Sequence, residues 1–169
     1  MKRVAPGFTL VELLIVVAIV AILAAIAIPS LIRSRVSANE AAMLGDTRTV
    51  ISAEAAYFSV SGGFYGDPPC LVEPYAAGCI PSYPTDGPSF LDSHVAALAP
   101  KAGYARSFTG APATAGFSCY VYGGTPLRLG ETGVRGYFGD CSGRLCFTPS
   151  GTVAPISGGA LDASCLLPQ

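Results

Sequence analysis

Gly7-Phe8-Thr9-Leu10-Val11-Glu12 opens a stretch that stays apolar as far as Ile28. Within residues 8–28 only Thr9 and Glu12 are polar. A helix of this length reaches about 30 Å at roughly 1.5 Å per residue, which matches the hydrocarbon thickness of a bilayer. The stretch therefore predicts a membrane-spanning helix that carries one carboxylate four residues after Phe8.

The carboxylate of Glu12 needs a partner, because a charged side chain costs about 2.5 to 3.5 kcal/mol at the centre of a bilayer and less near its surface. A short polar leader, residues 1–7, comes before the apolar run, unlike a secretory signal peptide, whose cleavage site follows its apolar region. Cleavage after Gly7 would free the α-amino group of Phe8 one helical turn from Glu12. The ammonium would then neutralise Glu12, within one helix or between staggered subunits.

Gly7, Phe8 and Glu12 in this order, the apolar helix and Pro29 at its end resemble the N-terminal segment of type IV pilins and of the pseudopilins of type II secretion. The close resemblance covers residues 1 to about 60, and beyond that it is architectural. It implies that a prepilin peptidase cuts between Gly7 and Phe8 and methylates the new amine of Phe8. It also implies that Glu12 docks an incoming subunit against the terminal amine of a neighbour in a growing filament.

An ordinary signal anchor that tethers an unrelated secreted domain is the alternative interpretation of this segment. It leaves unexplained why the leader ends in Gly7 and why Glu12 falls one turn into the helix.

Pro29 removes one backbone hydrogen bond and is predicted to bend the helix rather than end it. The next 31 residues, 30–60, contain no proline, and Ser61-Gly62-Gly63 supplies a C-terminal stop. Within them, apolar pairs recur every seven residues, which predicts an amphipathic helix. These pairs are Met43/Leu44, Val50/Ile51 and Tyr57/Phe58, and the charged residues expected on the rest of the surface are Arg35, Glu40, Asp46, Arg48 and Glu54.

The region after this helix is rich in proline and glycine, which predicts a long surface loop with at most a short helix at residues 89–99. Runs of β-branched and aromatic residues then alternate with turn signals and predict an antiparallel sheet of three or four strands. The runs are residues 104–109, 117–122, 134–139 and 144–148, with a turn at 140–143 and a weak last strand at 153–156.

The predicted fold class is α+β, with a long N-terminal helix packed on a small antiparallel sheet, which is the order of elements in pilins. One half of the helix is membrane-spanning and the other amphipathic. The predicted divisions are a leader at 1–7, a transmembrane or filament-core helix at 8–28, its amphipathic continuation at 29–61, the Pro/Gly-rich loop at 62–103, and the sheet with a disulfide-bonded tail at 104–169.

Charge predicts the orientation of the chain. Lys2 and Arg3 precede the apolar run and are expected to stay in the cytoplasm, so the C-terminal domain would face the periplasm. The formal net charge is −1 and the remaining Lys and Arg are scattered, which disfavours specific nucleic-acid binding.

Six cysteines follow the membrane segment, and an oxidising compartment would pair them. Cys70 with Cys79 and Cys141 with Cys146 would close short loops, which leaves Cys119 with Cys165. A zinc site at Cys141 and Cys146 is the alternative, but no second close cysteine pair repeats the spacing and the chain has one histidine, His94.

Catalytic chemistry has few candidate groups in this chain. After cleavage, His94 and Lys101 are the only candidate bases, and the carboxylates are too dispersed to define a paired site or a calcium loop. The sequence therefore predicts neither an enzyme nor a cofactor or metal site.

The resemblance implies a structural subunit of a type IV pilus that is stored in the inner membrane and polymerises through its N-terminal helix. Its partners would be copies of itself, other pilins or pseudopilins, the prepilin peptidase, the inner-membrane assembly platform and the membrane. The alternatives are a pseudopilin of a type II secretion system and a membrane-tethered periplasmic binding module.

Overall fold

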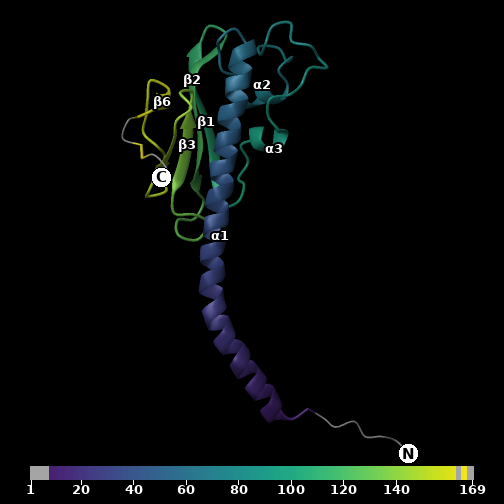
Figure 1. Cartoon of the computed structure of the whole chain (residues 1–169), viewed down its shortest axis with the longest axis vertical. Helices are drawn as coiled ribbons and strands as arrows, with labels where there is room; N and C mark the ends of the chain where they lie inside the picture. The colour runs from purple at the N-terminus through teal and green to yellow at the C-terminus, as the bar shows by residue number, and fades with distance from the viewer. Residues whose placement is uncertain (1–7, 163–164, 167–169) are drawn as a thin grey trace, which may run out of the picture. The chain divides into compact units, whose positions relative to one another are not determined.

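The computed structural model describes residues 8–162 and 165–166. The chain divides into two compact units, residues 1–35 and 36–169. Helix α1 (Leu10–Val60) runs through both units (Figure 1). The predicted leader, which includes Gly7, lies outside the described residues.

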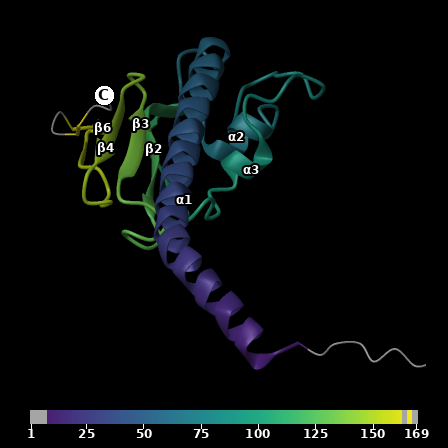
Figure 2. The same ribbon diagram turned by 60° about the horizontal axis from the view of Figure 1, so that its bottom comes forward.

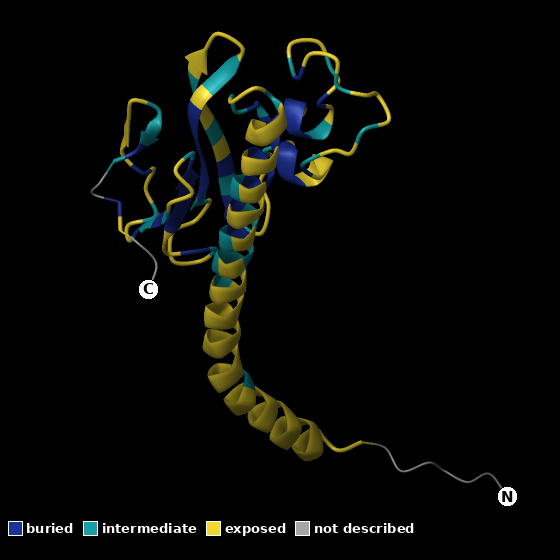
Figure 3. Cartoon of the chain, turned by 45° about the horizontal axis from the view of Figure 1, so that its top comes forward, coloured by how far each residue is buried: buried dark blue, intermediate teal, exposed yellow. Residues whose placement is uncertain are grey.

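In the first unit, α1 is apolar and exposed. Every described residue from Phe8 to Arg35 is exposed except the half-buried Ala24 (Figure 3). By length and composition, α1 is the one helix among the described residues that could cross a membrane. It continues through Pro29 without a break, and a bend at Pro29 stays a prediction.

A four-stranded antiparallel meander forms the sheet of the second unit. Its strands are β1 (Tyr104–Ala113), β2 (Gly116–Pro126), β3 (Gly136–Asp140) and β4 (Leu145–Thr148), in the spatial order β1-β2-β3-β4. Each overlaps a predicted run. A turn closes β3 to β4 where it was expected, with the Asp140 carboxylate accepting from the Ser142 N–H at 3.0 Å and Gly143 at a φ of 75°. The predicted α+β class is therefore confirmed.

The second half of α1 packs against one face of this sheet. Three of the predicted stripe residues, Met43, Val50 and Tyr57, are each at most 3% exposed, and they share one core cluster with tyrosines of the sheet. These tyrosines are Tyr104, Tyr120, Tyr122 and Tyr137. The seven-residue repeat thus identifies the face of α1 that meets the sheet.

Gly139 of β3 allows α1 to lie close to the sheet. A Cβ atom at Gly139 would stand 2.6 Å from Cδ1 of Ile51 and 2.9 Å from Cγ2 of Thr47. Both distances are far below van der Waals contact, so a side chain here would displace the Ile51 and Thr47 side chains of α1.

Two short helices lie between α1 and β1: α2 (Pro68–Val72) and α3 (Ser93–Ala96). Figures 1 and 2 draw them on the side of α1 opposite to the sheet. Helix α3 falls inside the expected 89–99 segment. Helix α2 differs from the predicted loop, because Pro68 and Pro69 occupy the first positions of the helix, where proline is favourable and does not break it.

The disulfides differ in part from the predicted pairing. Cys70 bonds to Cys79 as expected, but Cys119 bonds to Cys141 and Cys146 bonds to Cys165. The predicted pairs Cys141–Cys146 and Cys119–Cys165 are wrong. Cys141, in the turn after β3, packs with the cluster that faces α1, whereas Cys146 of β4 belongs to the cluster on the opposite face, so the two residues do not pair.

The C-terminal segment covers that opposite face. Its strands β5 (Ile156–Ser157) and β6 (Ala160–Leu161) form a separate hairpin, so the expected last strand lies slightly later than predicted. Ala154, Leu161 and Cys165 pack with Val121 and Phe138 of the sheet.

Candidate functional site

Thr9 and Glu12 form a reciprocal cap at the start of α1. The Glu12 carboxylate oxygen Oε2 accepts hydrogen bonds from the Thr9 backbone N–H at 2.9 Å and from the Thr9 hydroxyl at 2.7 Å. In return, the Thr9 Oγ1 accepts from the Glu12 N–H at 3.2 Å. This is a capping box, in which two otherwise unpaired N–H groups of the first turn are satisfied.

In the uncut chain, the capping box supplies the hydrogen-bond partner of Glu12. In the uncut chain the Phe8 nitrogen is a peptide nitrogen and carries no charge, so the predicted ammonium partner does not yet exist. Thr9 occupies one oxygen of Glu12 instead, and Phe8 precedes the helix with 75% of its surface exposed. The spacing Thr9-x-x-Glu12 is itself a sequence signal for this cap, although the cap was not predicted above.

Residues 10–32 present a continuous series of exposed apolar side chains. Its Leu, Ile and Val side chains are between 50% and 77% exposed. Covering one such side chain with lipid or protein stabilises by about 1.5 to 3 kcal/mol when burial is complete. The segment therefore needs a bilayer or other apolar helices around it.

Three carboxylates of α1 that were expected on its solvated face instead hold segments of the second unit. Glu40 binds the loop before β3: it accepts from the N–H groups of Val134 and Arg135 at 2.8 and 3.2 Å and from the Tyr137 hydroxyl at 3.0 Å. Asn39 donates to the Thr132 carbonyl of the same loop at 2.9 Å.

Asp46 is the second of these carboxylates. It pairs with Lys101 at 2.7 Å and lies 3.9 Å from Arg106. The buried Arg106 guanidinium donates to the carbonyls of His94, Val95 and Ala99 around the end of α3. Of the two candidate bases, Lys101 thus pairs with Asp46 through its ammonium group, and His94 contributes its backbone carbonyl to Arg106.

Glu54 is the third and is fully buried. Its Oε2 accepts from the Gly66 N–H at 3.1 Å, and its Oε1 has no hydrogen-bond partner among the described residues. Burial raises the pKa of Glu54 to about 8, the Gly66 N–H opposes this rise, and the neighbouring Asp67 carboxylate adds to it.

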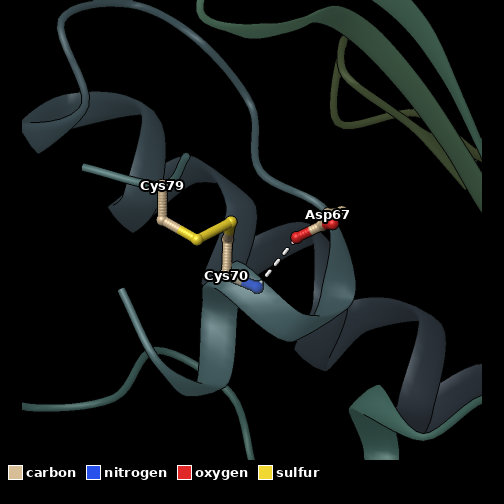
Figure 4. A group of neighbouring side chains, drawn as sticks. All are labelled: Asp67, Cys70 and Cys79. Carbon is tan, nitrogen blue, oxygen red and sulfur yellow. Dashed lines mark hydrogen bonds between the residues drawn. A yellow bond between two sulfur atoms is a disulfide. The ribbon is translucent and has the colours of Figure 1, made fainter. Parts of the chain in front are cut away.

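Asp67, Cys70 and Cys79 are the group of described residues whose ligand atoms come close enough for a metal ion. Figure 4 shows what they do instead. The two sulfurs form a disulfide, and the Asp67 Oδ1 accepts from the Cys70 N–H at 2.8 Å as the N-cap of α2. These contacts explain why the three residues lie close together: they stabilise the first turn of α2.

Comparisons with known proteins confirm the resemblance to the type IV pilin family. Residues 2–28 match the family described as the prokaryotic N-terminal methylation motif. A segment of 38 residues is 63% identical to the type IV wide pilus major component PilA4 of Thermus thermophilus. A segment of 53 residues is 43% identical to the type IV major pilin protein PilA of Myxococcus xanthus.

These matches cover a limited part of each protein. They span 22% and 31% of this chain, and 29% and 24% of the two relatives. No solved structure matches the chain significantly. The similarity therefore concerns the N-terminal segment, and the second unit is characterised by its own structure.

Proposed function

We propose that this chain, whose N-terminal segment is that of the type IV pilin family, is a structural subunit of a type IV pilus. A prepilin peptidase would cut between Gly7 and Phe8 and methylate the Phe8 amine. The subunit would wait in the inner membrane and then enter the filament through α1.

One observation carries this proposal: a methylation motif at residues 2–28 overlaps the exposed apolar part of α1, residues 10–32, in which Glu12 is the single carboxylate. Lipid and a bundle of apolar helices are similar environments for such side chains. Transfer from the membrane into a filament core therefore need not expose them to water.

Cleavage gives Glu12 the partner that it lacks before processing. The new ammonium of Phe8 would meet the exposed Glu12 carboxylate, whose charge lies in an otherwise apolar helix end. Because a carboxylate among apolar side chains is costly unless it is paired, we assign Glu12 and the Phe8 amine to the docking of successive subunits.

The orientation follows from charge and from cysteine chemistry. Lys2 and Arg3 favour a cytoplasmic N-terminus. The three disulfides of the second unit suit an oxidising compartment, so this unit would face the periplasm before assembly and the exterior afterwards.

Mass spectrometry of the mature N-terminus together with electron microscopy tests the proposal. The expected result is a chain that begins at methylated Phe8 and long surface fibres that contain it. Fibres built from chains that still begin at Met1 would refute the role of processing. Loss of exoprotein secretion on deletion, with no surface fibres, would assign the chain to the pseudopilins, and an uncut monomer would favour a tethered binding module.

A further inference from the structure

We infer that Glu54 is a pH-sensitive latch, which holds residues 64–67 against α1 while its carboxyl group is protonated and releases them when it ionises. The inference goes beyond filament formation, because it concerns the second unit alone.

The latch is a single buried contact between α1 and the chain that leaves it. Glu54 is 0% exposed, and its Oε2 accepts from the Gly66 N–H at 3.1 Å. Its Oε1 finds no hydrogen-bond partner within the described part of the chain. A protonated carboxyl tolerates this site far better than a carboxylate, whose unpartnered oxygen would require water.

Gly66 is shaped for this contact. A Cβ atom at Gly66 would stand 3.0 Å from Cζ of Tyr57, one turn after Glu54 on the same face of α1. Only glycine brings the backbone N–H over the Tyr57 ring to the carboxyl group without displacing the ring.

The titratable groups around Glu54 come from each element that packs there. They are Tyr57 of α1, Tyr65 and Asp67 of the segment itself, and Tyr120 of β2. Among these groups Asp67 is the carboxylate, and it carries a negative charge. It disfavours ionisation of Glu54, in the same direction as burial.

The direction of the pH effect follows from linkage. Burial holds the pKa of Glu54 at about 8 in the folded unit, against an ordinary value of 4.5 for a solvated glutamate. The closed state therefore binds one more proton than the open state between these two values. Closure is strongest below the lower value. As pH rises from there toward about 8, the opening constant increases roughly tenfold per pH unit.

Opening is expected to be local at first. Gly66 directly precedes Asp67, the N-cap of α2, so release of Gly66 frees the approach to that helix. The backbone pair between Tyr65 and Phe117, at 2.9 and 3.0 Å, and the Tyr65 hydroxyl on the Cys141 carbonyl, at 2.9 Å, resist the movement. These contacts set the cost of opening but do not titrate near neutral pH.

Hydrogen exchange of residues 64–72 in the full chain, held in detergent micelles, tests the latch. After correction for intrinsic exchange, the wild-type opening constant should rise roughly tenfold per pH unit from about pH 5 and level off near pH 8. In Glu54→Gln, which keeps an acceptor for Gly66 but cannot ionise, the profile should be nearly flat. Glu40→Gln changes another inward carboxylate of α1 and should keep the wild-type slope.

A second variant covers the case in which Glu54→Gln does not fold. Asp67→Asn keeps a good N-cap for α2 and removes the neighbouring negative charge. The plateau should then be reached at a lower pH, because the pKa of Glu54 falls. A flat wild-type profile, a Glu54→Gln profile equal to the wild type, or an unshifted plateau in Asp67→Asn overturns the inference.

Discussion

The Tyr137 hydroxyl donates a hydrogen bond of 3.0 Å to the Glu40 carboxylate, and so joins β3 to α1 through residues that are 97 positions apart. The same carboxylate accepts from the Val134 and Arg135 N–H groups. Glu40 therefore binds the turn that leads into β3 and holds it against α1.

Glu40→Ala is expected to lower the free energy of unfolding of the second unit by about 1 to 2 kcal/mol. The loss stays moderate because Val134 is 46% exposed, so water can replace part of the lost contacts. Denaturant unfolding of the full chain in micelles, followed by circular dichroism, measures it.

Glu131→Ala is the matched control for this change. Its carboxylate pairs with Arg128 three residues away, and both side chains are more than two-thirds exposed. Removing such a pair changes stability by less than about 0.5 kcal/mol. Equal effects of the two variants would contradict the role assigned to Glu40.

Thr9→Val is expected to loosen the first turn of α1. The variant keeps the shape of the side chain but loses the hydroxyl that bonds to Glu12 in both directions. Amide exchange at residues 10–13 should rise roughly fivefold in micelles, whereas Thr9→Ser should resemble the wild type. Unchanged exchange in Thr9→Val would show that the cap does not hold the helix end.

The sequence predicted the parts of this fold that follow a local rule. The seven-residue spacing identified Met43, Val50 and Tyr57 as buried, and turn residues located the β3–β4 connection. The apolar run beside Glu12 indicated the candidate site in the same way, because the residues of this site are close in sequence and lie on one helix.

The remaining contacts depend on segments that are distant in sequence. Charge alone predicts that Glu40, Asp46 and Glu54 lie on the surface. Their partners belong to later segments of the chain, which reach α1 only in the folded structure. Cys141 and Cys146 are close in sequence, but their side chains pack in two clusters on opposite faces of the sheet. Spacing alone could not reveal either arrangement.

A digest under non-reducing conditions is expected to recover three linked peptide pairs: Cys70 with Cys79, Cys119 with Cys141, and Cys146 with Cys165. Removing the Cys146–Cys165 bond with a double serine variant should cost about 2 to 4 kcal/mol, because this bond closes a loop that carries Ala154 and Leu161 of the cluster on the face opposite to α1. Recovery of a Cys141–Cys146 peptide would contradict this structure.

Glu12→Ala is expected to leave cleavage after Gly7 and membrane insertion intact while it greatly reduces filament assembly. The variant keeps the apolar helix but removes the acceptor that we propose for the Phe8 ammonium. Immunoblots of membrane fractions report processing, and electron microscopy counts fibres. Glu131→Ala serves as the control for loss of an exposed carboxylate, and normal fibres from Glu12→Ala would refute the docking role.

Gly45→Ala and Gly139→Ala are expected to act in opposite directions on the second unit. A Cβ atom at Gly45 meets nothing within 4 Å, so alanine should stabilise α1 by about 0.5 to 1 kcal/mol through its higher helix propensity. At Gly139 the added atom would press on Ile51 and Thr47, which should destabilise by about 1 to 3 kcal/mol. Thermal unfolding of both variants in micelles gives the comparison.

Filament yield then decides what the open space at Gly45 means. If the stabilised Gly45→Ala subunit assembles normally, the glycine is a tolerated weak point of α1. If it assembles poorly despite folding better, another copy of the chain must approach the helix backbone at Gly45 more closely than a methyl group allows. Destabilisation of the isolated subunit by Gly45→Ala would contradict the geometry described for this face of α1.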